Sequence, residues 1–192
     1  LGLQLDSLAD MVTSGLVPGI VMFQLFNMLE PNWISFGYES TSDTLSSLEQ
    51  YSFLPFLGLL ITLSSAYRLA KFNISTNQSD EFIGLPTPAN ALLILSFPLI
   101  LEFQNNDMMN AIILNKWFLI TVTLLSSFLL NANIRLLALK FKNFGFKDNA
   151  ARYILLMFAV VLLVIFQFAA IPLIIMSYIL ISVLNNSKTT IT

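Results

Sequence analysis

An all-α, polytopic transmembrane helical bundle is the fold class that this sequence predicts. Hydrophobic residues make up 56% of the 192 residues, whereas charged residues make up only 10%. A soluble domain usually carries about 25% charged residues, so most of this surface avoids water. Apolar runs of membrane-spanning length also recur along the chain, separated by polar segments. We expect a single membrane domain over residues 1–192, with about five to six spans.

Composition also excludes several kinds of function. The formal net charge is −2, which gives no reason to expect a nucleic-acid partner. The chain contains no cysteine and no histidine. Zinc sites built from these residues, thiol catalysis and histidine acid–base chemistry are therefore excluded. Any catalysis must use carboxylates, lysine, arginine, tyrosine or serine.

The first half of the chain predicts two membrane helices. A helix needs about 20 mostly apolar residues to cross a bilayer. Residues 3–29 satisfy this requirement, and Pro31 follows where a proline should end the helix. Residues 32–50 form a polar loop, and the second span covers residues 51–72.

Three further apolar blocks follow. The third span covers residues 88–103 and opens with prolines, which suit a helix start. The fourth covers residues 111–130. The last block, 153–184, has a length between that of one helix and two, and Pro172 interrupts it. A C-terminal hydrophobic hairpin that turns near 167–172 is the favoured interpretation, with a single kinked helix as the alternative.

The distribution of basic residues predicts the orientation in the membrane. The segments 68–86 and 131–152 hold seven of the nine lysines and arginines, whereas the loop 32–50 has none. Basic segments stay on the cytoplasmic side, so the loop 32–50 should be external. We expect a multi-pass protein of a bacterial inner membrane, with its functional end in the cytoplasm.

Gly2, Asp6 and Asp10 are spaced by four residues, which puts them on one face of a helix. Two ionised carboxylates on adjacent turns repel each other, and a bound cation relieves this repulsion. Oxygen ligands suit Mg²⁺ or Mn²⁺. Gly2 would let a bulky ligand approach the backbone on the same face. The alternative is that both acids simply sit at a helix N-terminus, favoured by its dipole.

Three segments resemble motifs of the CDP-alcohol phosphotransferase family. G-x3-D-x3-D at residues 2–10 is similar to the second half of the family motif D-x2-D-G-x2-A-R-x8-G-x3-D-x3-D. R-L-A-K-F-N at 68–73 resembles R-L-A-R-F-N of its serine-transferring branch, and F-I-G-L-P-T-P-A at 82–89 resembles F-x-G-L-P-x-P-A. A looser match surrounds Asn133-Ile134-Arg135.

The resemblance implies transfer of a phosphatidyl group from CDP-diacylglycerol to L-serine, with Mg²⁺ or Mn²⁺ as cofactor and a homodimer as the assembly. It implies that Asp6 is a metal ligand and that Asp10 is both a metal ligand and the general base. It also implies substrate-binding roles for Gly2, Arg68, Lys71, Asn73, Pro86 and Arg135. Membrane anchoring is the alternative role for the basic residues, and chain breaking before a helix is the alternative role for Pro86.

The first half of the family motif is absent, because its two aspartates and its A-R dipeptide would precede Gly2. We therefore expect an N-terminally truncated chain that lacks the family's N-terminal helices. In this form it should be inactive and should bind metal and nucleotide-activated lipid weakly or not at all.

Two other functions stay open from sequence. Another acceptor, glycerol 3-phosphate or an inositol phosphate, would favour more basic residues near the site. A transporter would use Asp6 and Asp10 as an ion site, but further charges near the middle of other spans and internal symmetry are both missing from the sequence.

Overall fold

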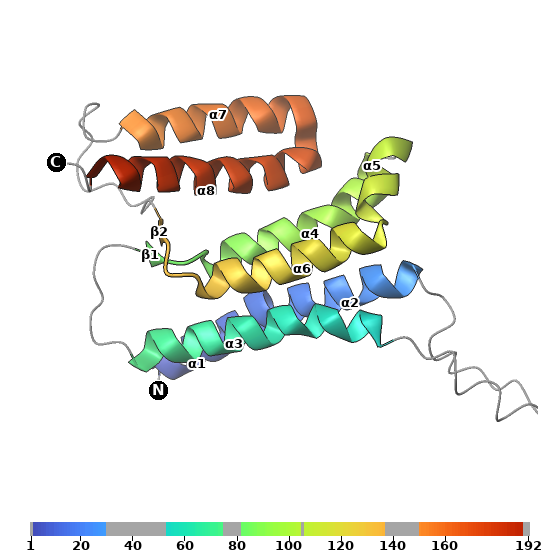
Figure 1. The fold of residues 1–192 in the computed structure, drawn as a ribbon, viewed down its shortest axis with the longest axis horizontal. Helices are drawn as coiled ribbons and strands as arrows, with labels where there is room; N and C mark the ends of the chain where they lie inside the picture. Colours follow the sequence, from blue (N-terminus) through green and yellow to red (C-terminus); the bar gives the residue numbers. More distant parts are fainter. Residues whose placement is uncertain (1, 30–52, 75–81, 105, 137–149, 190–192) are drawn as a thin grey trace, which may run out of the picture.

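The computed structural model describes residues 2–29, 53–74, 82–104, 106–136 and 150–189. Nearly all of these residues are helical, and the helices pack lengthwise into a bundle (Figure 1). The predicted all-α class is therefore confirmed. The predicted polar loop 32–50, and most of the basic stretch 131–152, lie outside the described residues.

The first helix is continuous from Gly2 to Leu29 but changes its winding near the middle. It consists of α1 (Gly2–Asp10), a π-helical turn (Met11–Leu16) and α2 (Val17–Leu29). The π-helical turn precedes Pro18, which has no N–H and whose ring would clash with the carbonyl four residues earlier in an α-helix. A locally wider turn removes this clash.

Helix α3 (Leu59–Ile74) follows a 3-10 turn (Leu54–Gly58) and packs closely against the first helix. A Cβ atom at Gly19 would lie only 2.0 Å from Thr62 Oγ1, so a larger residue cannot fit there without a shift. Thr62 Oγ1 also donates a hydrogen bond to the Gly15 carbonyl, at 3.1 Å. Small residues and interhelical hydrogen bonds are the usual means of packing membrane helices.

The predicted fourth span is split in the structure. A short helix, α5 (Asp107–Ile113), meets α6 (Lys116–Asn131) at an angle of 60°. Asn115 lies at the break, and its Oδ1 accepts a hydrogen bond from the Trp117 N–H at 2.9 Å. This N-cap starts a new helix where an apolar run alone predicts one continuous span.

Helix α4 (Thr87–Phe103) begins after a short β-ribbon that joins two distant parts of the chain. Strand β1 (Phe82–Ile83) pairs antiparallel with β2 (Arg135–Leu136), with Ile83 opposite Arg135. The ribbon therefore fixes the start of α4 beside the end of α6.

The C-terminal block forms two helices, α7 (Ala150–Phe166) and α8 (Ala170–Thr189), joined by a turn at Gln167–Ala169. The two helices pack side by side and antiparallel (Figure 1). Gln104, just after α4, holds this turn: its Oε1 accepts the Ala169 N–H at 3.0 Å, and its Nε2 donates to the Phe166 carbonyl at 2.7 Å.

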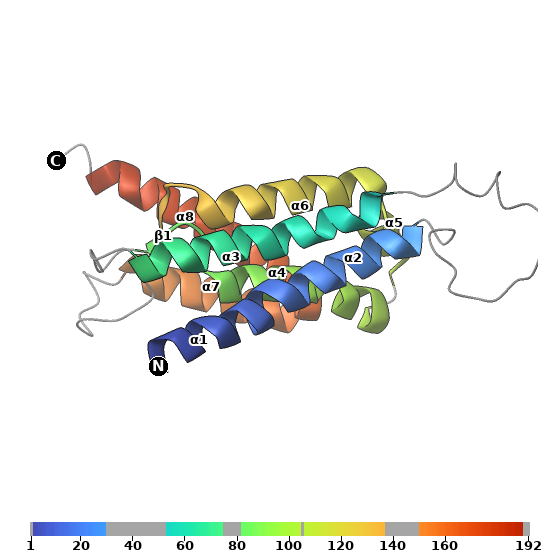
Figure 2. The ribbon, with the colours of Figure 1, turned by 90° about the horizontal axis from the view of Figure 1, so that it is seen from below.

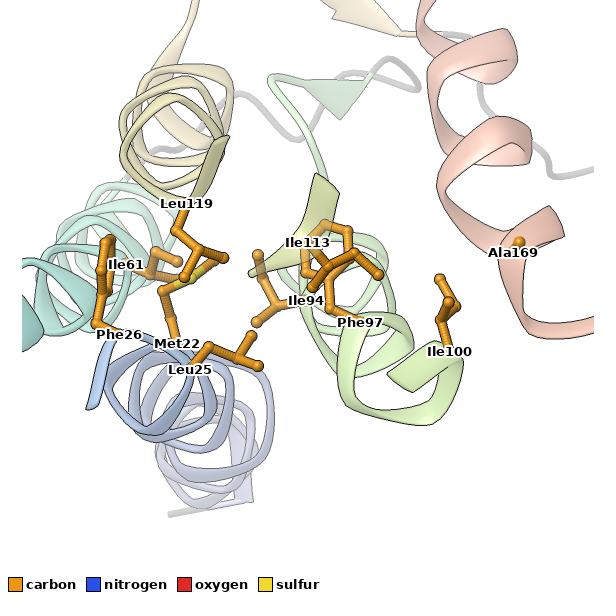
Figure 3. Packing of buried hydrophobic residues seen from close by; sticks show 10 residues of the cluster. All are labelled: Met22, Leu25, Phe26, Ile61, Ile94, Phe97, Ile100, Ile113, Leu119 and Ala169. Atoms are coloured by element: carbon orange, nitrogen blue, oxygen red, sulfur yellow. The ribbon is translucent and has the colours of Figure 1, made fainter. Parts of the chain in front are cut away.

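The main core lies where the first helix, α3, α4 and α6 meet (Figure 3). Its buried side chains are all apolar. They are Met22, Leu25, Phe26, Ile61, Ile94, Phe97, Ile100, Ile113, Leu119 and Ala169. Large apolar side chains also cover the outside, including Val164 and Phe128. Such an exterior is expected for helices that face lipid.

Two helical stretches of the described chain, Gln4–Leu29 and Arg152–Val183, are by length and composition apolar enough to cross a membrane. The second includes most of both helices of the hairpin and the turn between them, so it is not one straight helix. The bent pair α5–α6 would add a third if it forms one span. The total of five to six spans stays a prediction.

Candidate active site

One end of the bundle brings the three motif segments together. The start of α1, the end of α3 and the start of α4 all lie at this end, together with the β-ribbon (Figures 1 and 2). The first motif segment thus lies near segments that begin 66 and 80 residues later in the sequence.

The carboxylate face of α1 is regular α-helix. Asp6 is exposed and Asp10 is half-buried, and residues at this spacing have Cβ atoms about 5–6 Å apart. No heavy atom lies within 4 Å of a Cβ atom built on Gly2, so the face is open there. The structure therefore keeps these three predicted site residues on one helix face.

A hydrogen bond connects this helix to the second motif segment. Ser7 Oγ lies 3.1 Å from Asn73 Oδ1 and donates to it. Asn73 and Lys71 are exposed on the last turns of α3. Both polar groups therefore lie on the part of α3 that adjoins the carboxylate helix.

Arg68 connects the second motif segment to the third. Its Nη1 donates to the Leu130 carbonyl at 2.6 Å, and its Nη2 donates to the Gly84 carbonyl at 3.4 Å. Leu130 lies in the last turn of α6, where backbone carbonyls lack intrahelical partners. The predicted substrate ligand Arg68 therefore directs its guanidinium at the backbone of the bundle.

The turn before α4 depends on Gly84. Its φ is +73°, a left-handed conformation that glycine adopts without strain. The Gly84 N–H donates to the Ile134 carbonyl at 2.8 Å, and the Leu85 N–H donates to the Leu129 carbonyl at 2.9 Å. Pro86 follows as the N-cap of α4 and is half-buried. Pro86 thus has a clear structural role at the predicted site.

Arg135 lies on β2, directly opposite Ile83 of the third motif segment. Its backbone position puts it at the same end of the bundle as the carboxylates. Its side chain is outside the described part of the structure, so its contact with substrate stays a prediction.

The carboxylates fit a divalent metal in chemistry but do not complete a site. Asp6 and Asp10 offer the oxygen ligands that Mg²⁺ and Mn²⁺ prefer. Within the described residues, no group of three or more Asp, Glu, His or Cys side chains could hold a metal ion. The pair would therefore supply only some of the ligands, and the others must come from substrate, water or residues outside these ranges.

Sequence reasoning missed three residues that take part in the contacts around this site. Ser7 lies between the two aspartates, and Gly84 lies within the F-I-G-L-P stretch. Both positions fall inside motifs that were recognised, so the signal was present, but their contacts were not visible from spacing. Tyr178, which interacts electrostatically with Arg68 from α8, has no such signal in the sequence.

The fold and the site define a helical membrane protein with paired carboxylates at one end of the bundle. Comparison with known proteins is more specific. The chain is 32% identical over 96 residues to the CDP-diacylglycerol–serine O-phosphatidyltransferase of Helicobacter pylori strain J99. It is 33% identical over 103 residues to the Bacillus subtilis protein of the same name. An archaetidylserine synthase of Methanothermobacter thermautotrophicus is 29% identical over 96 residues. The resemblance drawn from the motifs is confirmed.

Each of these similarities covers only part of this chain and only part of the relative. The match covers 49% of this chain and 32% of the Helicobacter protein, and 50% of this chain and 45% of the Bacillus protein. For the archaeal synthase, the shares are 50% of this chain and 32% of that protein. No family model matches the chain. No solved structure matches it either.

Proposed function

We propose that the complete protein containing this chain transfers the phosphatidyl group of CDP-diacylglycerol to L-serine and releases phosphatidylserine and CMP. The observation that carries the proposal is the joining of three motif segments by hydrogen bonds from Ser7 and Arg68. The names of the relatives support the choice of acceptor, because serine appears in each of the three.

Asp10 is the proposed general base. It would accept the proton of the serine hydroxyl while the serine oxygen forms a bond to the phosphorus that carries diacylglycerol. The bond from that phosphorus to the CMP oxygen breaks, and CMP leaves with the electron pair. Asp6 and Asp10 would hold Mg²⁺ or Mn²⁺, which when bound neutralises charge on the pyrophosphate. A carboxylate is a weak base for an alcohol, and orientation of the hydroxyl by the protein lowers the base strength that the reaction requires.

The exposed polar groups on α3 are the proposed acceptor contacts. The ammonium group of Lys71 can attract the serine carboxylate, and the Asn73 amide lies beside Ser7 on the carboxylate helix. Gly2 would leave space for the lipid pyrophosphate. A cytoplasmic location for this end, in the inner membrane of a bacterium, and a homodimeric assembly belong to the same proposal.

The proposal is tested by expressing the complete reading frame that encodes this chain. Membranes with CDP-diacylglycerol receive labelled L-serine, glycerol 3-phosphate or inositol phosphate in separate reactions. We expect Mg²⁺- or Mn²⁺-dependent labelling of lipid by serine, with CMP released in equal amount. Labelling by a phosphorylated acceptor alone would overturn the choice of serine.

A further inference from the structure

Arg68 differs from its neighbours on α3 in where its side chain goes. Lys71 and Asn73 are exposed, whereas Arg68 is half-buried, and its guanidinium contacts backbone of two other segments. A group that binds substrate should present its donors to the open site. Here the Nη1 and Nη2 donors are directed at the Leu130 and Gly84 carbonyls.

The turn at Gly84 is shaped around this guanidinium. A Cβ atom at Gly84 would lie 2.7 Å from Arg68 Nη1, 2.8 Å from the Leu130 carbonyl oxygen and 3.0 Å from the Ala132 carbonyl oxygen. The missing side chain therefore makes room for the arginine between the turn and the end of α6. A positive charge is also favourable at a helix C-terminus, where the dipole is negative.

A residue of the C-terminal hairpin lies within electrostatic range of the same arginine. Tyr178 on α8 is buried, and it interacts electrostatically with Arg68. Tyr178 packs in a cluster with Leu85, which directly follows the Gly84 turn, and with Leu136 of β2. One side chain from α3 thus contacts α6 and the turn before α4, and interacts electrostatically with α8.

We infer that Arg68 is a positioning residue: its guanidinium fixes the end of α6 to the Gly84 turn and so holds the motif segments in register, instead of binding either substrate. The inference deepens the proposed function and rests on it. Loss of this contact shifts the start of α4 and the end of α3, which carries Lys71 and Asn73, relative to each other. Misplacement by about 1 Å can cost about 100-fold in rate.

Kinetics of the complete protein in proteoliposomes test the inference. For Arg68→Gln we expect kcat to fall by about 100-fold, with the KM for serine and for CDP-diacylglycerol changed by less than about threefold. Arg68→Lys should restore part of kcat, because lysine keeps the charge but lacks the fork that reaches two carbonyls. Arg152→Gln, at a half-buried arginine of the same end of the bundle, is the matched control and should keep its kcat.

A cross-linking readout makes the test independent of catalysis. Asn90 on α4 accepts a hydrogen bond from Ser126 on α6, about one helical turn before Leu130, whose carbonyl accepts from Arg68. The chain has no cysteine, so the pair N90C/S126C can report the register of these helices once any cysteine outside it is replaced. We expect efficient disulfide formation with Arg68 present and several-fold slower formation in Arg68→Gln.

Two results would overturn the inference. One is a KM for serine or CDP-diacylglycerol that rises more than about tenfold in Arg68→Gln while kcat is kept, because that pattern marks a substrate ligand. The other is equal cross-linking in both backgrounds. An unmodified protein that makes no phosphatidylserine would reject the proposed function, and the cross-linking comparison would still decide the role of Arg68.

Discussion

Asp6 and Asp10 lie one turn apart on α1, yet their surroundings differ. Asp6 is exposed, whereas Asp10 is half-buried and immediately precedes the π-helical turn. The more enclosed carboxylate is closer to the packed helices and is better placed to meet a substrate held against them. This difference agrees with the roles proposed for the two acids, a metal ligand for Asp6 and a base for Asp10.

The substitution Asp10→Asn should abolish turnover and leave the protein folded. The amide keeps the shape of the side chain but cannot accept a proton from the serine hydroxyl. Serine incorporation in the complete protein, together with thermal unfolding in detergent, measures both effects. Activity that survives in this variant would remove Asp10 as the base.

Gly19 offers a second prediction at the scale of one residue. Gly19→Ala adds a Cβ atom that would lie 2.0 Å from Thr62 Oγ1 and 3.4 Å from the Gly58 carbonyl oxygen, so the Thr62 side chain or the helices must shift. We expect a loss of about 1–3 kcal/mol in the free energy of unfolding, the usual range for overpacking. Gly2→Ala is the stability control, since its Cβ atom would meet nothing within 4 Å. Equal stability of the two variants would contradict the close packing of α2 and α3.

At the scale of helices, sequence predicts existence and type well and local irregularity poorly. The predicted spans 3–29, 51–72 and 88–103 correspond to helices that the structure contains, because length and apolar composition determine them. The bend before α6 and the π-helical turn were missed. The Asn115 cap and the packing of Pro18 decide those features, and an average over an apolar window does not detect either.

At the candidate site too, local features could be predicted from sequence, whereas long-range contacts could not. The i, i+4 spacing of Asp6 and Asp10 is a local property, so their common helix face could be predicted from sequence. The bonds from Ser7 to Asn73 and from Arg68 to Gly84 join residues that are 66 and 16 positions apart. Such contacts depend on how the helices pack against one another, and a sequence motif gives no information about that packing.

The turn of the C-terminal hairpin provides the prediction at this scale. Gln104→Ala removes an acceptor for the Ala169 N–H and a donor for the Phe166 carbonyl. Each partly buried group left unsatisfied costs about 1–3 kcal/mol, so the hairpin should dock less firmly on α4. Limited proteolysis near Gln167 should then be faster than in the unmodified protein. Gln24→Ala, at an exposed position of α2, is the control, and equal cleavage of both variants would contradict this role.

The whole molecule is asymmetric from one end to the other. The motif segments and the β-ribbon occupy one end, whereas the α5–α6 bend and the hairpin turn occupy the other (Figure 1). The proposed chemistry uses both water-soluble serine and a membrane lipid, so it requires a polar end next to lipid-facing helices. The asymmetry also makes the orientation in the membrane a testable property.

Single cysteines at Lys116 and Arg152 should report this orientation. Lys116 begins α6 at the end opposite to the site, and Arg152 lies near the start of α7 at the site end. In intact bacterial cells, an impermeant maleimide should label Lys116→Cys directly and Arg152→Cys only after permeabilisation. The reverse pattern would place the carboxylates outside the cell.

The contact between Asn90 and Ser126 has a consequence for biogenesis. Asn90 is fully buried on α4, and its side-chain carbonyl oxygen accepts a hydrogen bond from the Ser126 hydroxyl on α6, a helix that leaves the ribosome later. A polar side chain without a hydrogen-bond partner is unfavourable in the hydrocarbon region of a bilayer. Interhelical hydrogen bonds of this kind contribute about 1–2 kcal/mol in model peptides. We therefore expect α4 to be held more firmly in the bilayer once α6 has joined it.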